Sequence, residues 1–164
     1  MQKGVSPVEN HLTILSESLD KKIAVLEDIQ AYNLRQEEAF TQETPDMDSF
    51  DQALEEKEEL IQRIEKLDEG FELLYERIAE QLKENKAAYA SQISELQAKI
   101  QKVTDLSTAI QAQEARNKKL IEEYFTKAKS SIKQNRQGSK AAYDYYKNMS
   151  GAAFNRSQFL DSKN

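Results

Sequence analysis

Few side chains of this sequence are of the types that carry out catalysis. His11 is the only histidine, so a histidine-based triad, metal cage or proton shuttle has no second member. The adjacent carboxylates Glu55–Glu56 and Glu58–Glu59 stand with lysine at helical spacing. That pattern is typical of a solvated helix face rather than of an acid–base pair. The sequence therefore predicts that the protein is not an enzyme.

The sequence also contains little that would indicate a metal or cofactor site. Asp46, Asp48 and Asp51 are spaced as in the start of a calcium loop, but the glycine and the terminal glutamate that such a loop needs are not at their places. The chain has no cysteine, which removes thiolate ligands and disulfides, and it has no glycine-rich phosphate loop. We expect no metal, no cofactor and no small-molecule substrate.

The composition favours helix. Hydrophobic residues make up 38% and charged residues 32% of the chain, with only 4 Gly and 2 Pro, so the interior is rich in strong helix formers. Residues 1–10 lack the apolar core of a signal peptide, and no run of about 18 apolar residues could cross a bilayer. Together with the lack of cysteine, this predicts a cytoplasmic protein without membrane insertion.

Charge is divided unevenly along the chain. Residues 1–115 carry 12 Lys/Arg and 25 Asp/Glu, a net −13, whereas residues 116–164 carry 11 and 4, a net +7. A basic end can bind nucleic acid or an acidic partner, or can fold back on its own acidic body. The charge pattern alone leaves these readings open.

Apolar residues recur in steps of three and four, which predicts an all-α fold: an elongated antiparallel bundle or coiled coil of three long helices with a flexible C-terminal tail. The expected helices are about 8–42, 49–85 and 89–136. Pro45 interrupts the first stripe, and Ser49 with Gln52 forms the pattern of a capping box that begins the second helix. The turn at 83–90 rests only on a weakened apolar rhythm.

We expect one elongated domain over residues 1–137, followed by an aromatic-rich tail over 138–164 that is flexible or ordered by a partner. The third helix is expected to overhang the other two. Asn33, Glu114 and Asn117 lie in or beside the apolar stripe, where polar residues either fix helix register or mark a part of the stripe that is open to a partner.

The best candidate for a binding site is the wide apolar arc at the end of the third helix. Basic residues surround it, as expected for an exposed patch that receives a partner helix. Burial of the same arc in a homodimer is the alternative. Nucleic-acid binding is less favoured, because Tyr124 and Phe125 fall on the apolar stripe, where they pack on protein. The candidate residues are Asn117, Leu120, Ile121, Tyr124, Phe125, Ile132, Tyr143, Tyr146 and Phe159.

Two segments give the chain a resemblance to the FlgN-type flagellar export chaperones. Residues 47–61, MDSFDQALEEKEELI, are similar to the acidic helix start of that family with its Glu-Lys-Glu pair. Residues 114–121, EARNKKLI, are similar to its C-terminal Asn-x-x-Leu helix. With the order of the helices, the likeness spans roughly residues 8–147.

The resemblance implies a cytoplasmic helical chaperone that keeps hook-filament junction subunits, the hook-associated proteins, unassembled and delivers them to the flagellar type III export apparatus. It also implies that the partner is gripped through the C-terminal helical region, at Asn117, Leu120, Ile121, Tyr124, Phe125 and Ile132. Two other readings remain: a structural coiled-coil protein that homo-oligomerises, and a FliT-type chaperone with a different flagellar client.

Overall fold

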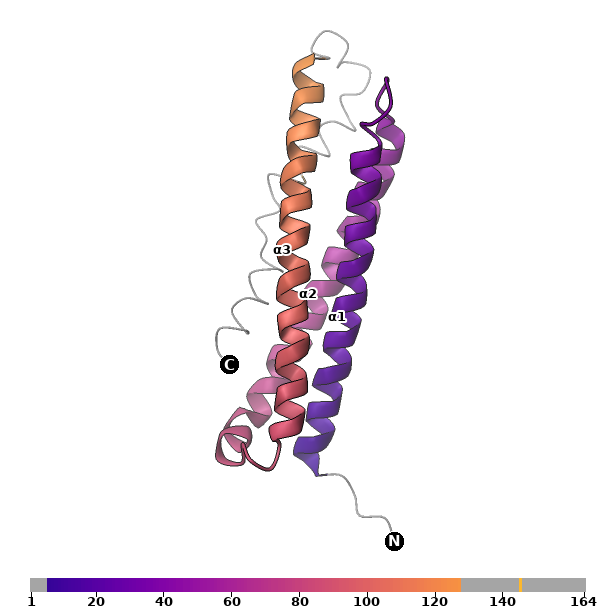
Figure 1. The fold of residues 1–164 in the computed structure, drawn as a ribbon. Coiled ribbons are helices and arrows are strands. Elements are labelled where there is room, and N and C mark those ends of the chain that lie inside the picture. Colours follow the sequence, from indigo (N-terminus) through magenta and orange to yellow (C-terminus); the bar gives the residue numbers. More distant parts are fainter. Residues whose placement is uncertain (1–5, 128–144, 146–164) are drawn as a thin grey trace.

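The computed structural model describes residues 6–127 and Tyr145. Three long helices make up this part of the chain: α1 (Pro7–Glu38), α2 (Met47–Glu84) and α3 (Ala90–Lys127). They lie side by side in an elongated bundle (Figure 1). The predicted all-α bundle of three long helices is confirmed. The tail 138–164, apart from Tyr145, lies outside the described residues, as does the expected stretch of the third helix beyond Lys127.

The first helix begins and ends with local hydrogen bonds. Ser6 caps its N-terminus by accepting a bond from the Glu9 amide at 3.1 Å, and Pro7 occupies the first turn, where its missing donor costs nothing. The helix ends at Glu38 instead of continuing to 42. The next amides bond three residues back, Phe40 to the Glu37 carbonyl and Thr41 to the Glu38 carbonyl, each at 3.0 Å, which tightens the chain into a turn.

The second helix begins earlier than the capping box predicted. Asp46 is the N-cap, and its Oδ1 accepts a hydrogen bond from the Ser49 amide at 3.1 Å. Asp46 follows Pro45 directly. Pro45 disfavours helical backbone at the residue before it, so the helix is capped at the first position after the proline. The predicted N-cap role of Ser49 is therefore wrong, because Ser49 donates its own amide to the cap.

The helices bury their apolar stripes against α1. This helix packs along both α2 and α3, whereas α2 and α3 make few contacts with each other. Each fully buried Leu, Ile or Phe stabilises the bundle by about 1.5–3 kcal/mol. The main core runs along most of the bundle and contains Val8, Leu12, Leu15, Leu19, Val25, Leu26, Ile29, Leu60, Ile64, Phe71, Ile78, Leu82, Leu96, Ile100, Val103 and Ile110.

A second, smaller core lies at the end of the bundle where α1 connects to α2, called here the upper end (Figure 1). Phe40 packs edge-on against Phe50 and Tyr124, with ring centroids 5.5 and 6.3 Å apart. Its buried members are Ala39, Phe50, Leu54, Ile121 and Tyr145. The connection between α2 and α3 lies at the opposite, lower end. None of the three helices, over their described lengths, has an apolar stretch that could span a membrane.

Candidate partner-binding site

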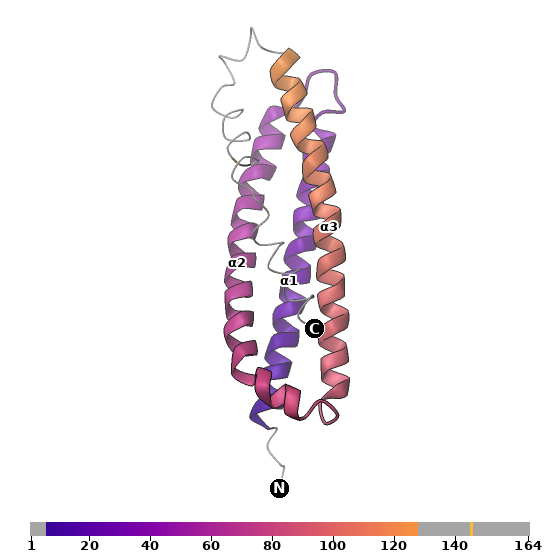
Figure 2. The same cartoon turned by 90° about the vertical axis from the view of Figure 1, so that its left-hand side faces the viewer.

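The space between α2 and α3, called here the seam, separates two helices that make few contacts with each other. Figure 2 looks into it, with α1 behind the two flanking helices. Toward the lower end the seam contains a groove of about 150 Å³. This lower groove is lined by Phe71, Tyr75, Ala79, Leu82, Lys83 and Lys86 from α2 and its end, and by Ile93, Leu96, Gln97 and Ile100 from α3.

Toward the upper end the seam is crossed by a buried ion pair. Lys57 of α2 lies at an apolar-stripe position and is fully buried. Its Nζ lies 2.6 Å from Oε1 of Glu114 on α3 and donates to Oδ1 of Asn33 on α1 at 2.7 Å. A buried ammonium needs such partners because leaving it unpaired is costly. Lys57 therefore ties all three helices together at one level.

Amide side chains extend this contact into a layer. Asn117 Nδ2 donates to the Asn33 carbonyl at 3.1 Å and approaches Gln36 Oε1 at 3.5 Å. Gln36 Nε2 donates to the Phe50 carbonyl at 3.2 Å. We call this set the polar layer: Asn33, Gln36, Lys57, Glu114 and Asn117. A helix that slides by one turn would leave these buried groups unsatisfied, so the layer fixes the register of the bundle.

Tyr145, the one described residue after α3, closes the seam over the polar layer. It is 8% exposed and packs in the upper core. The Lys57 Nζ lies 4.7 Å from the centroid of its ring, a cation–π contact, and its hydroxyl lies 3.5 Å from Glu114 Oε1. A residue from beyond the third helix thus occupies the position that a fourth helix would take.

Two titratable groups near this end have shifted pKa values. Burial lowers the pKa of Lys57, although the charge and hydrogen bond of Glu114 act in the opposite direction. Burial also raises the pKa of Asp51, in the second turn of α2, and the neighbouring charges of Asp48 and Glu55 raise it further. Asp51 is thus a carboxylate placed where its charge is unfavourable.

The structure divides the predicted site residues into three groups. Asn117 and Ile121 are buried inside the bundle. Leu120, Tyr124 and Phe125 are half-buried, and the last two pack against the upper core. Ile132, Tyr143, Tyr146 and Phe159 lie outside the described residues. The structure thus brings Asn117, Ile121, Tyr124 and Phe125 together near Tyr145.

As expected, α1 ends before the last turns of α3, at Glu38 near the level of Asn117, but the connection at 39–46 and the first turn of α2 supply cover there. Phe40 just after α1, and Phe50 in the first turn of α2, both reach the upper core beside Tyr124 and Ile121. The reason is the short connection at 39–46, which the Asp46 amide closes on the Ala39 carbonyl at 2.9 Å. The described part of α3 therefore has cover on one side, from α1 and α2.

Sequence reasoning missed two contributors to this region, Lys57 and Tyr145, and a buried ion pair farther down the bundle. Lys57 occupies a stripe position among Leu54 and Ile61, and a lone lysine there is the signal for a buried partner. Lys22 of α1 and Asp68 of α2 form a second buried pair at 2.6 Å. Tyr145 carries no signal of its own, because three tyrosines lie within residues 143–146.

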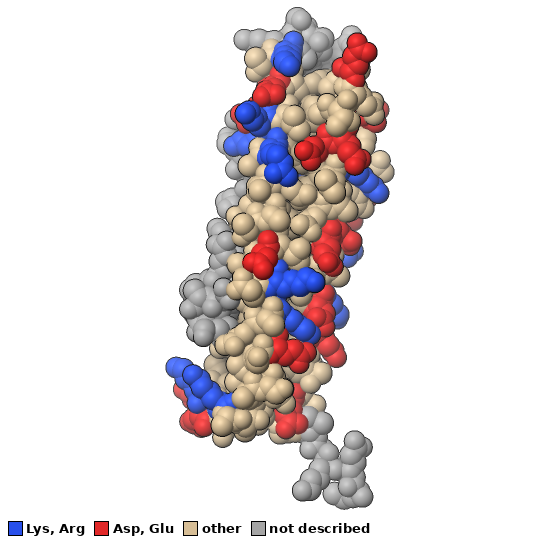
Figure 3. Space-filling view, in the orientation of Figure 1, with Lys and Arg blue, Asp and Glu red and all other residues tan. Residues whose placement is uncertain are grey.

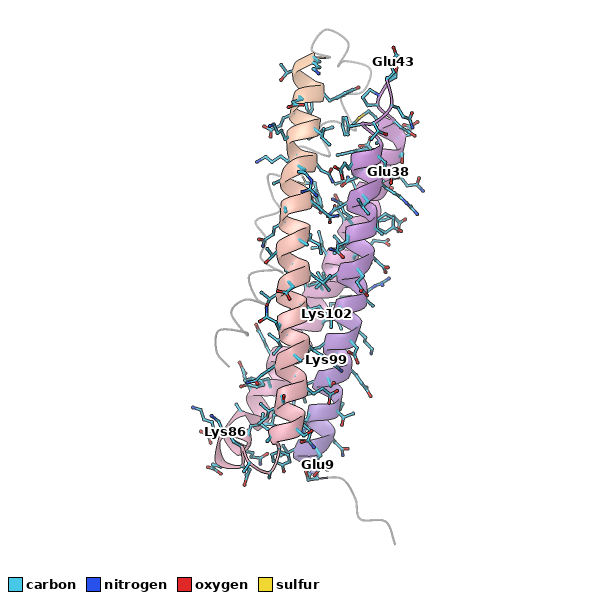
Figure 4. All side chains as sticks on the ribbon, in the orientation of Figure 1. Glu9, Glu38, Glu43, Lys86, Lys99 and Lys102 are labelled. Atoms are coloured by element: carbon cyan, nitrogen blue, oxygen red, sulfur yellow. The ribbon has the colours of Figure 1, made fainter. Side chains whose placement is uncertain are left out.

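The outer surface differs from the seam. On the face formed by α3 and α1, positive and negative side chains are interspersed (Figure 3). Figure 4 shows Lys99 where α3 meets α1, and its Nζ lies 3.0 Å from Asp20 Oδ1. Glu43 and Lys86 mark the connections at the two ends of the bundle. Among the described residues, no group of three or more His, Cys, Asp or Glu side chains could hold a metal ion.

Comparison with known proteins gives a match to a protein family. A family model described as FlgN protein matches residues 11–151, which is most of the chain. No curated protein and no solved structure matches it. The matched span includes α1 from His11 onward, the whole of α2 and α3, and Tyr145.

Proposed function

Since the chain belongs to the FlgN family, a family of flagellar export chaperones and not of enzymes, we propose that it binds hook-associated proteins in the cytoplasm. It keeps them from assembling prematurely and hands them to the type III export apparatus. The client binds at the upper end of the bundle, on the C-terminal part of α3. Leu120, Tyr124 and Phe125 make direct contacts, and Ile132, Tyr143, Tyr146 and Phe159 extend the surface.

The observation that supports this proposal is the half-burial of Leu120, Tyr124 and Phe125 on the last turns of α3. Large apolar side chains left partly in water at one end of a helix gain about 25 cal/mol for each Å² that a partner covers. An amphipathic client helix supplies such cover. Asn117 and Ile121 are buried behind these residues, so they position the α3 face and do not contact the client while Tyr145 is in place.

Covering apolar surface would also explain how the chaperone keeps its client unassembled. Subunits that polymerise through apolar helix faces expose those faces before they assemble, and such faces aggregate. A chaperone that covers them holds the subunit in a soluble, unassembled form. Delivery requires reversible binding, which is expected of an interface of modest area with a charged rim.

The test is binding of a purified hook-associated protein to the full chain, measured by isothermal titration calorimetry. The double variant Leu120→Asp with Phe125→Asp is expected to weaken binding at least tenfold while circular dichroism shows unchanged helix content. The matched control is Leu73→Asp, which places the same charge at a site on α2 that is 64% exposed, and it is expected to bind as the wild type does.

Three outcomes contradict the proposal. Unchanged affinity of the double variant removes the site assignment. A stable dimer in light scattering that dissociates in the double variant, together with no binding of hook-associated proteins, supports the structural coiled-coil reading instead. Binding of a different flagellar subunit at the same residues supports the FliT-type reading.

A further inference from the structure

The arrangement of the helices leaves a position for a fourth one. Because α1 packs on both neighbours while α2 and α3 make few contacts, the three helices occupy three corners of a four-helix bundle. The open position is the seam between α2 and α3 (Figure 2). Its lower part is the groove lined by Phe71 and Ile100. Apolar side chains line both of its walls, so an apolar segment that enters it is stabilised by burial.

Tyr145 shows that the chain returns to this seam after α3. Its ring lies over Lys57 of α2, and its hydroxyl faces Glu114 of α3, so both walls of the seam contact it. It is also helical. Nineteen residues, 146–164, follow it, and they must leave from this point in the upper half of the seam.

The register of the two walls gives a distance to the groove. Phe71 lies fourteen residues after Lys57 on α2, and Ile100 lies fourteen residues before Glu114 on the antiparallel α3. Both are therefore about 21 Å from the level of Tyr145, at 1.5 Å per helical residue. Fourteen residues after Tyr145 the sequence reaches Phe159, followed by Leu160. A descending helical segment brings this apolar pair level with Phe71 and Ile100.

Charge favours the same placement. Residues 146–164 carry Lys147, Arg156 and Lys163 against a single acid, Asp161. Residues 58–84 of α2 carry nine acidic and four basic side chains around the whole helix, and the charged residues that line the groove itself are Lys83 and Lys86. The segment and this part of α2 therefore have opposite net charges and attract each other at long range, and the attraction lessens with added salt.

We propose that residues 146–164 dock along the seam below Tyr145, with Phe159 and Leu160 in the lower groove between Phe71 and Ile100, and so form the fourth member of the bundle. The groove is thus an interaction surface whose occupant is the chain's own C-terminal segment. This docking describes the chain without a client, so Tyr146 and Phe159 join the proposed client surface only after the segment leaves the seam. The proposed client contacts of Leu120, Tyr124 and Phe125 do not depend on it and are tested separately.

The test uses the full chain, which has no cysteine and so accepts a single spin label at Ser162→Cys. The position of the spin label is read from NMR spectra, because the label broadens the signals of isoleucine methyl groups that lie near it. Ile93 and Ile100 in the lower groove are expected to lose most of their intensity, and Ile14, half-exposed on α1, much less. The same labelled chain with Phe159→Asp and Leu160→Asp is the control, and it is expected to recover the Ile93 and Ile100 signals.

Three results overturn the proposal. The first is unbroadened Ile93 and Ile100 signals in the labelled chain. The second is equal broadening with and without the two aspartates. The third comes from a mixture of two kinds of chain, one with the spin label and no methyl isotope, the other with the isotope and no spin label. If Ile93 and Ile100 are broadened to the same extent in this mixture, the segment in the groove belongs to a second copy of the chain. Circular dichroism of the control variant confirms that its helices remain folded.

Discussion

The polar layer and the lower groove lie in the same seam, yet they differ in how α2 and α3 meet. At the polar layer, Lys57 and Glu114 join the two helices at 2.6 Å. At the lower groove, Phe71 and Ile100 line a hollow of about 150 Å³. A buried charge is stable only beside a particular partner, whereas an apolar wall accepts any apolar cover. The polar layer therefore specifies which helices meet, whereas the groove can be filled by any apolar segment of suitable size.

The largest effect is expected where the polar layer is broken. Glu114→Ala leaves Lys57 buried without its carboxylate, and we expect the free energy of unfolding in urea to fall by about 3–5 kcal/mol. The double variant Lys57→Met with Glu114→Leu removes both charges and is expected to recover most of that loss. A loss below about 1 kcal/mol for Glu114→Ala would show that the pair does not hold the seam together.

Gly70 tests whether the exposed side of α2 in the lower half of the bundle is free of other segments. It lies in the middle of α2, and a Cβ built there meets nothing within 4 Å. Gly70→Ala is therefore expected to raise the free energy of unfolding by about 1 kcal/mol, because alanine favours helix. Thermal unfolding measures it, with Glu69→Ala at the exposed neighbouring position as the control. A destabilised Gly70→Ala would mean that another segment packs closely on Gly70.

Lys99 provides the exposed counterpart of the buried pair. It contacts Asp20 and Glu95 at 3.0 and 3.3 Å, but both carboxylate side chains are 58% exposed. We expect Lys99→Ala to cost at most about 1 kcal/mol, and less in high salt. Urea unfolding at low and high ionic strength measures it. If the loss equals that of Glu114→Ala, burial is not what distinguishes the two pairs.

The smallest effect concerns Asp51. Because its pKa is raised in the folded protein, the folded state binds more protons than the unfolded one between the ordinary and the raised pKa, and stability falls as pH rises through that interval. Asp51→Asn removes the unfavourable charge, so we expect it to stabilise the protein slightly at pH 7. The gain should diminish as the pH falls below the raised pKa and disappear below the ordinary pKa of an aspartate. A gain that is independent of pH contradicts the electrostatic explanation.

The helices could be predicted from sequence because their period is a local property. Stripe positions such as Leu12, Ile64 and Ile100 follow from steps of three and four. The packing around Ile121 could not be predicted in the same way. Its burial depends on Phe40 and Phe50, which reach it only because the connection at 39–46 turns tightly. A periodic pattern shows that a face needs cover, but not which segment supplies it.

The polar layer lies between these cases. Asn33 and Asn117 stand out in the stripe, and register is one of the two roles predicted for such residues. Their partners could not be read from sequence, because the Asn117 amide bonds to a backbone carbonyl 84 residues away. Helix ends have a similar limit: both Asp46 and Ser49 are good N-caps, and the proline just before Asp46 decides between them.

The central position of α1 also sets an order of folding. α1 and α2 are neighbours in sequence and form a local hairpin, whereas the contacts between α1 and α3 join residues about 80 positions apart, as in the Lys99–Ser16 hydrogen bond. Local contacts form faster than distant ones. During synthesis, the hairpin can therefore form while α3 is still being made, with Lys57 and Asn33 hydrated at its open side. The arrival of α3 removes that water and buries the charge, so the cost of burying Lys57 falls on the last step of folding.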